Sequence, residues 1–164
     1  MELRLGELLI DRGILDPAQV RTILEQQRRT GEPFGVLAES MYDVAPTAIE
    51  DAWALQYARL TRVIDPDAES YDPRAIELVT RRQAWQFRAL PVRFDGLELM
   101  LATTERHLRR TLRFAMNVLG VPVYLVMASP DGLGRGLCRH YPWPGMSPAS
   151  VLDDQLDRLL AMAG

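Results

Sequence analysis

The feature that most constrains the fold is an internal repeat in the first third of the 164-residue chain. The segment from Arg4 to Gln27 recurs, with changes, from Pro33 to Gln56, an offset of 29 residues. At that offset one glycine, one proline and one glutamine of each copy coincide, and several apolar residues fall on apolar residues. The matching pairs are Gly6 and Gly35, Leu8 and Leu37, Leu15 and Val44, Pro17 and Pro46, Val20 and Ile49, Leu24 and Trp53, and Gln27 and Gln56. Such a unit cannot bury its apolar face alone, so the two copies are expected to pack on each other.

Each copy has the pattern of a helical hairpin. A short amphipathic helix is predicted over about 5–12 and again over about 35–41, and a second helix opens at Asp16-Pro17 and at Ala45-Pro46. Proline is favoured at the first helical position because its missing N–H would have no helical partner there, and Asp16 is a good N-cap. Residues 1–62 are therefore predicted to form a pair of helical hairpins.

The pattern changes after an Asp- and Pro-rich linker at 64–73, and residues 63–141 are predicted to form an α+β subdomain. Strand-like runs at 89–94 and 97–102 flank Asp95-Gly96, which is a hairpin turn signal, and Pro91 places the first strand at an edge or a bulge. A third strand is predicted over 121–126. Helices are predicted over 74–82, 107–119 and 129–141, with Gly120 as the C′ residue of the second.

The predicted fold class is thus α+β: a pair of helical hairpins followed by a small, three-stranded, mainly antiparallel sheet with helices on one face. Residues 142–164 are predicted to form a linker and an amphipathic helix over 150–163, with Ser150 and Asp153 as a capping box. One face of this helix carries Leu152, Leu156, Leu159 and Leu160. The pattern leaves open whether that face docks on this chain or on another.

Patterns for catalysis and metal binding are missing from the sequence. It has no GxxxxGK[ST] loop, and the glycine-rich stretch 132–136 falls in a predicted helix without the acidic partner of a dinucleotide fingerprint. With one cysteine, Cys138, and two histidines, His107 and His140, no metal site of standard spacing can be written. The chain is therefore predicted not to be an enzyme and to need no metal or cofactor.

Charge and cysteine use restrict the partners and the compartment. The formal net charge of −3 gives no overall attraction to nucleic acid or anionic lipid. Four arginines after the predicted hairpin are expected to form a solvated helix face, with nucleic-acid contact as the weaker alternative: Arg106, Arg109, Arg110 and Arg113. A lone cysteine suits a reducing compartment, no apolar run is long enough to span a bilayer, and Met1–Ile10 is too charged for a signal peptide. A cytoplasmic protein without nucleic-acid partner or membrane insertion is expected.

One group of residues at the front of the chain suits a nucleotide. A glycine at a helix start, such as Gly6, exposes N–H groups near the positive end of the helix dipole. An arginine beside it, Arg4, can bind a phosphate or the O6/N7 edge of guanine in bidentate fashion. The Gln27 amide can both donate and accept a hydrogen bond, and leucines can pack on purine faces. Taken singly, a solvated arginine, a helix-packing glycine and core leucines remain the alternatives.

The same residues resemble a known motif. Arg4-Leu5-Gly6, Leu9, Gly13, Leu15, Val20, Leu24 and Gln27 are similar to RLGxxLxxxGxLxxxxLxxxLxxQ of the MshEN domain, and the likeness continues to about Tyr141. MshEN domains form the N-terminal part of many type II secretion and type IV pilus assembly ATPases and occur attached to some membrane glycosyltransferases. Members bind cyclic di-GMP through two tandem motifs. The resemblance implies a first half-site of Arg4, Leu5, Gly6, Leu9, Leu24 and Gln27.

The second motif departs from the family pattern. The resemblance implies a second half-site of Phe34, Gly35, Trp53 and Gln56, but Pro33 occupies the arginine position, and Ala38 and Tyr42 replace a leucine and a glycine. Two functions stay open. In the first, the chain is a cyclic di-GMP receptor that regulates a secretion or pilus ATPase, a glycosyltransferase or an inner-membrane partner. In the second, it is a nucleotide-independent docking module with a decayed ligand site.

Overall fold

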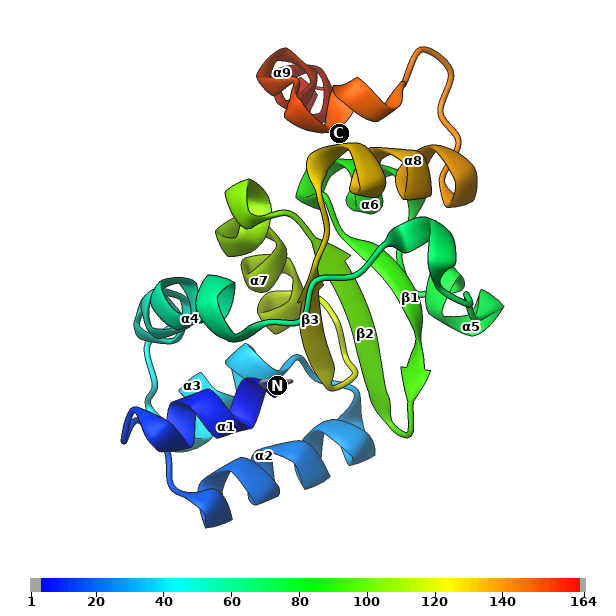
Figure 1. Ribbon diagram of the computed structural model, residues 1–164. Coiled ribbons are helices and arrows are strands. Elements are labelled where there is room, and N and C mark those ends of the chain that lie inside the picture. The colour runs from blue at the N-terminus through cyan, green and yellow to red at the C-terminus, as the bar shows by residue number, and fades with distance from the viewer. Residues whose placement is uncertain (1–3, 163–164) are drawn as a thin grey trace.

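The computed structural model describes residues 4–162, apart from the side chains at positions 5, 55–60 and 161. In this part of the chain, helices precede a three-stranded sheet, and a C-terminal segment lies at the far end of the molecule from the first helices (Figure 1). The first elements are α1 (Leu5–Asp11), α2 (Pro17–Thr30), α3 (Phe34–Tyr42) and α4 (Pro46–Leu60). They are followed by η1 (Pro66–Ala68), α5 (Pro73–Glu77), α6 (Arg81–Phe87), β1 (Leu90–Asp95), β2 (Glu98–Thr103), η2 (Glu105–His107), α7 (Leu108–Asn117), β3 (Val123–Met127), α8 (Pro130–His140), η3 (Pro148–Leu152) and α9 (Asp154–Met162). The α+β fold class is confirmed.

The helical hairpins form where the repeat predicts them. Asp16 caps α2: its Oδ1 accepts from the backbone N–H of Gln19 at 2.8 Å, and the Gln19 side chain accepts from the backbone N–H of Asp16 at 2.9 Å. Gly31 ends α2 in the left-handed region with φ 71°, where glycine carries no Cβ penalty. These local signals turn the chain back on itself twice before the sheet begins.

The sheet is mixed rather than mainly antiparallel. β1 pairs antiparallel with β2, and β2 pairs parallel with β3, in the order β1-β2-β3. The connection from β2 to β3 contains η2 and α7, and a crossover of that length returns the chain in the parallel direction. The register shifts between Pro91 and Arg93, so the predicted bulge at the edge strand is confirmed.

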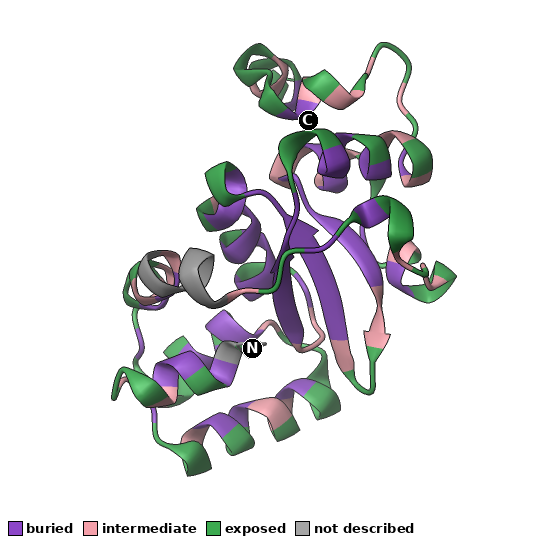
Figure 2. Ribbon diagram, in the orientation of Figure 1, coloured by how far each residue is buried: buried purple, intermediate pink, exposed green. Residues whose placement is uncertain are grey.

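Helices cover both faces of the sheet, where one face was expected. Leu90 is the register partner of Ala102, so Thr103, the next residue, points to the opposite face. On that face Thr111 of α7 lies against Thr103, with their Oγ1 atoms 2.6 Å apart. On the Leu90 face, Gly136 of α8 approaches so closely that a Cβ there would lie 2.5 Å from the Leu90 side chain. All five residues of β3 are buried as a result (Figure 2).

Two predicted details were wrong. The helix expected over 74–82 is two short helices, because Thr80 caps α6 with its Oγ1 accepting from the Gln83 N–H at 3.1 Å. Gly120 is not a helix C′ residue; α7 ends at Asn117 with Val118 as its C-cap. Gly120 instead packs on the backbone of Gly31, and a Cβ at position 120 would collide with the Gly31 carbonyl. Its role is close approach of two backbones.

The C-terminal segment docks on its own chain. The predicted helix is a 3-10 turn, η3, followed by α9, and position 163 lies outside the described residues. The predicted capping box is wrong, because Ser150 Oγ accepts from Ser147 N–H and Asp153 Oδ1 accepts from Gln155 N–H. Leu160 is 2% exposed, whereas Leu159 is 64% exposed. The apolar face is therefore shared between this chain's core and its surface.

Buried apolar residues form one cluster that runs through the described chain. It extends from the helical hairpins through the sheet to Val151 and Leu160 at the C-terminal end (Figure 2). Hairpins, sheet and C-terminal segment thus share a core. The division at 62 and 141 stays a prediction.

Candidate ligand-binding site

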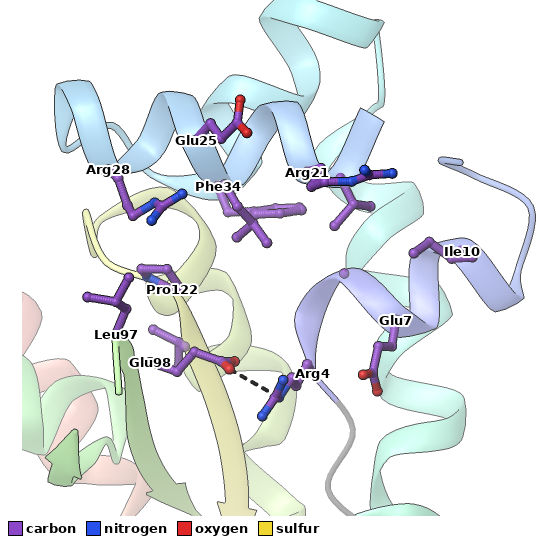
Figure 3. A pocket seen from close by; sticks show the side chains of 14 residues that line it. Arg4, Glu7, Ile10, Arg21, Glu25, Arg28, Phe34, Leu97, Glu98 and Pro122 are labelled. Atoms are coloured by element: carbon purple, nitrogen blue, oxygen red, sulfur yellow. Dashed lines mark ion pairs between the residues drawn. The ribbon is translucent and has the colours of Figure 1, made fainter. Parts of the chain in front are cut away.

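A cavity of about 530 Å³ lies where α1 and α2 face the end of the sheet (Figure 3). We call it the first cavity. Its lining is Arg4, Gly6, Glu7, Ile10, Val20, Arg21, Leu24, Glu25, Arg28, Phe34, Leu97, Glu98, Pro122 and Val123. Apolar side chains form most of its wall, and charged ends lie at its rim, a combination typical of small-molecule sites. The volume is within the usual range for a ligand pocket.

Arg4 holds its position through both backbone and side chain. Its backbone forms an isolated bridge with Tyr124 of β3, so the start of α1 is attached to the sheet edge. Its Nε lies 3.0 Å from Glu98 Oε1, and the arginine side chain is 59% exposed (Figure 3). Arg4 thus lies at the cavity mouth with its guanidinium paired to a carboxylate. An anionic ligand would have to compete with Glu98 for it.

The structure brings some of the implied first half-site together. Gly6 and Leu24 line the first cavity with Arg4, and Phe34 of the second copy lines it too. Gly6 also packs against Val20, whose side chain would collide with a Cβ at position 6. Leu9 is fully buried in the core.

The implied second half-site is mostly part of the core. Trp53 is fully buried, and Gly35 lies against α7, where a Cβ would come 3.0 Å from the Met116 carbonyl oxygen. The close approach explains glycine at position 35 without a ligand. The side chains of Leu5 and Gln56, two further implied contacts, lie outside the described residues.

Sequence reasoning missed several charged residues of this cavity. Arg21, Leu24 and Arg28 follow one another at helical spacings of three and four, which places them on one face of α2. That spacing was a usable signal. No sequence signal points to Glu98, because β2 comes to lie beside α1 only in the folded chain. Among the described lining residues, the arginines at 4, 21 and 28 are matched in number by the glutamates at 7, 25 and 98.

A second cavity, of about 360 Å³, adjoins the first. It is lined by Gln27, Arg28, Gly31, Arg74, Phe94, Gly96, Leu97, Gly120, Val121 and Pro122. Gln27 is 1% exposed, and neither its Nε2 nor its Oε1 has a hydrogen-bond partner among the described residues. A buried amide without partners carries a desolvation penalty, so it is an unusual feature of a folded protein.

Arg74 and Phe94 form a platform at the second cavity. The Arg74 guanidinium carbon lies 5.8 Å from the centre of the Phe94 ring, within the range of a cation–π contact. Asp72 orients the guanidinium through a contact of 2.9 Å between Arg74 Nη2 and Asp72 Oδ2. That hydrogen bond lowers the pKa of the Asp72 carboxyl below its ordinary value.

The arginine run before and along α7 is engaged within the protein. Each of its four members forms an ion pair in the described part of the chain: Arg106 with Asp154, Arg109 with Asp51, Arg110 with Asp157, and Arg113 with Glu50. These pairs tie α7 to α4 on one side and to α9 on the other. Because carboxylates already neutralise them, the arginines favour the solvated-face interpretation over nucleic-acid contact.

The histidines and the cysteine are not brought together. Within residues 4–162 no cluster of three or more His, Cys, Asp or Glu side chains is arranged to hold a metal ion. Burial, with Arg88 and Arg110 nearby, lowers the pKa of His107 to about 4, so its ring is neutral at pH 7. Nor does any helix in the described part of the chain have the length and apolarity needed to cross a bilayer.

Comparison with known proteins places the chain in a family. The family model described as the MshEN domain matches residues 53–147, more than half of the sequence. The chain belongs to the MshEN domain family. The resemblance read from the sequence is confirmed. The match begins at Trp53, so the Arg4–Gln27 motif of this MshEN domain precedes the matched range.

Two curated relatives have the same name, type IV pilus assembly ATPase PilB. The one from Myxococcus xanthus is 23% identical over 151 residues, which cover 92% of this MshEN domain and 26% of the relative. The one from Thermus thermophilus is 24% identical over 148 residues, covering 86% of this chain and 15% of the relative. The chain therefore spans about a quarter or less of their length. A solved structure titled "Structure of MshE with cdg" aligns at 27% identity with a TM-score of 0.42, over 85% of this chain and 99% of that one.

Proposed function

We propose that this MshEN domain is a non-catalytic receptor that binds cyclic di-GMP with one guanine in the first cavity. The observation that carries the proposal is the position of Arg4, Gly6 and Leu24, three residues of the family motif, around one cavity of suitable size. Arg4 would bind the guanine edge in bidentate fashion, and Leu24 and Phe34 would contact the base. Arg21 and Arg28, on the same face of α2, would attract the phosphates.

The proposal includes a role beside a pilus or secretion ATPase. Both named relatives are pilus assembly ATPases, which favours that context over a membrane glycosyltransferase. The chain has no phosphate-binding loop of the GxxxxGK[ST] type, so ATP hydrolysis would belong to the part of such ATPases that this chain does not match. A cytoplasmic location is part of the proposal, in line with the free thiol of Cys138.

Docking without nucleotide is less well supported. Its support from the sequence was the altered second motif, with Pro33, Ala38 and Tyr42, together with the leucine-lined last helix. In the structure Leu160 is buried in this chain's own core, and the Arg82 Nη2 donates to its carbonyl at 2.8 Å. That contact leaves a smaller apolar face for a partner, so cyclic di-GMP binding is the function we put forward.

Arg4→Ala is expected to weaken cyclic di-GMP binding by about tenfold to a hundredfold, because one bidentate arginine–guanine contact is lost. Isothermal titration of the 164-residue chain measures the effect. Arg12→Ala is the matched control: Arg12 lies just after α1, exposed, and is not among the described residues that line either cavity. A wild-type titration that stays flat to high micromolar ligand would refute the proposed function.

Glu98→Gln is expected to strengthen cyclic di-GMP binding by up to about fivefold. The substitution releases Arg4 from an ion pair that, being half-exposed, is worth about 0–1 kcal/mol, and it removes a negative charge from the phosphate's surroundings. The same titration measures it, with Glu39→Gln, on the exposed surface of α3, as the control. Weaker binding by Glu98→Gln than by Glu39→Gln would show that Glu98 itself contacts the ligand.

A further inference from the structure

We infer that the first and second cavities are one binding site for a cyclic dinucleotide, and that the second base lies on the Arg74–Phe94 platform rather than in the second repeat. This inference rests on the proposed function and adds the place of the second half of the ligand. It makes residues from outside both repeated motifs part of the recognition.

The second repeat offers the second base little space. Pro33 occupies the place of the repeat's arginine, and Trp53 and Ala38 are fully buried in the core. Gly35 is pressed against the backbone of α7. A ligand held by Arg4 at one end must therefore find contacts for its other base elsewhere along the surface.

The second cavity continues directly from the first. Arg28, Leu97 and Pro122 line both cavities, so these three residues form the wall that the cavities share. Leu97 is 61% exposed at the turn of the β-hairpin, an unusual place for a large apolar side chain. Figure 3 shows Arg28 of α2 next to Leu97 and Pro122. A ligand that crosses this wall would cover Leu97 and bring its phosphates to the guanidinium of Arg28.

The second cavity has the chemistry for a flat, polar ring. Aromatic and guanidinium planes are the surfaces on which bases stack, and the Asp72 carboxylate already orients the Arg74 guanidinium. Gln27, which lines this cavity, has a buried amide with both polar atoms unpartnered among the described residues. An amide donates and accepts at once, which matches the edge of a purine. A small rotation of the Gln27 side chain toward the cavity would allow its amide to form hydrogen bonds with a base bound there.

The order along the surface is thus Arg4, then Arg28, then Arg74. It matches the order base, phosphate, base of a cyclic dinucleotide. A mononucleotide fills only the first part of this order. The inference therefore predicts that the two ligands respond differently to substitutions in the second cavity.

The test is titration of the 164-residue chain with cyclic di-GMP and, separately, with GMP. Arg74→Ala is expected to weaken cyclic di-GMP binding about tenfold and to leave GMP binding unchanged. Phe94→Leu, which keeps the apolar bulk, is expected to act in the same direction through the lost stacking. Arg81→Ala is the matched control, because Arg81 also lies over an aromatic ring, Trp143 at 4.7 Å, on a part of the surface that lines neither cavity in the described chain.

The outcomes separate this inference from the proposed function. If the wild type binds cyclic di-GMP and Arg4→Ala weakens it, while Arg74→Ala and Phe94→Leu titrate like Arg81→Ala, the second base lies elsewhere and only this inference is overturned. Equal weakening of GMP and cyclic di-GMP by Arg74→Ala also overturns it, because the platform would then serve the first base. Absence of any wild-type binding overturns the proposed function itself.

Discussion

Arg88→Ala is expected to lower the free energy of unfolding by about 3–5 kcal/mol, the usual cost of removing one member of a buried ionic network. The Arg88 side chain is fully buried and follows α6. Its Nε donates to the Val151 carbonyl at 2.9 Å, its Nη2 to the Asp153 carbonyl at 3.3 Å, and its Nη1 pairs with Asp157 at 2.9 Å. Alanine leaves the Val151 and Asp153 carbonyls without this donor, leaves Asp157 paired with Arg110 alone, and opens a cavity beneath the C-terminal segment.

Denaturant unfolding followed by circular dichroism measures the loss, and hydrogen exchange locates it. Amides of η3 and α9 should lose protection first, since Arg88 attaches that segment to the rest of the core. Arg29→Ala, at an exposed position near the end of α2, is the control and should change stability by less than about 0.5 kcal/mol. A loss below about 1 kcal/mol for Arg88→Ala would show that the other contacts of the segment, apolar and ionic, hold it without Arg88.

Trp53→Ala is expected to cost about 3–5 kcal/mol of stability, because truncating a fully buried tryptophan leaves a large cavity between α4 and its neighbours. For a chain of this length the melting temperature should fall by about 6–20 °C. Thermal unfolding measures the effect. Trp143→Ala, at a partly exposed tryptophan, is the matched control and should shift the transition much less.

Trp53 also distinguishes a core role from a ligand role. The family resemblance implies that it contacts the nucleotide, whereas the structure buries it completely. Trp53→Phe keeps most of the packing, so it is expected to leave cyclic di-GMP affinity within about twofold of the wild type. A selective loss of affinity in a stable Trp53→Phe protein would show that ligand binding opens the second repeat.

The sequence predicts local structure well where one residue type has one physical use. Asp16-Pro17 starts a helix, Asp95-Gly96 turns a hairpin, and Pro91 marks a bulge, and the structure has all three. The prediction for Gly120 was wrong because a glycine after a helix can serve either as a cap or as a site of close packing. Only the segment packed against it in the fold decides between the two. The backbone of Gly31, far away in sequence, belongs to that segment.

The candidate site follows the same division. Arg4, Gly6 and Leu24 were found because the repeat displays them at helical spacing, and they line one cavity. Glu98 and Phe94 were missed because their strands reach the hairpins only after the chain has folded. No periodicity relates Gln27 to Arg74, so the second cavity has no signature within any short segment.

The four ion pairs of the arginine run have a consequence for communication across the molecule. Arg109 and Arg113 form ion pairs with α4, and Arg106 and Arg110 form ion pairs with α9. Two helices about a hundred residues apart in the sequence are therefore tied by charge to α7 and the turn before it. A movement of α7 toward one of these two helices lengthens the ion pairs with the other, although α4 and α9 need not contact each other. Added salt should weaken both sets of ion pairs together, because it screens exposed charges.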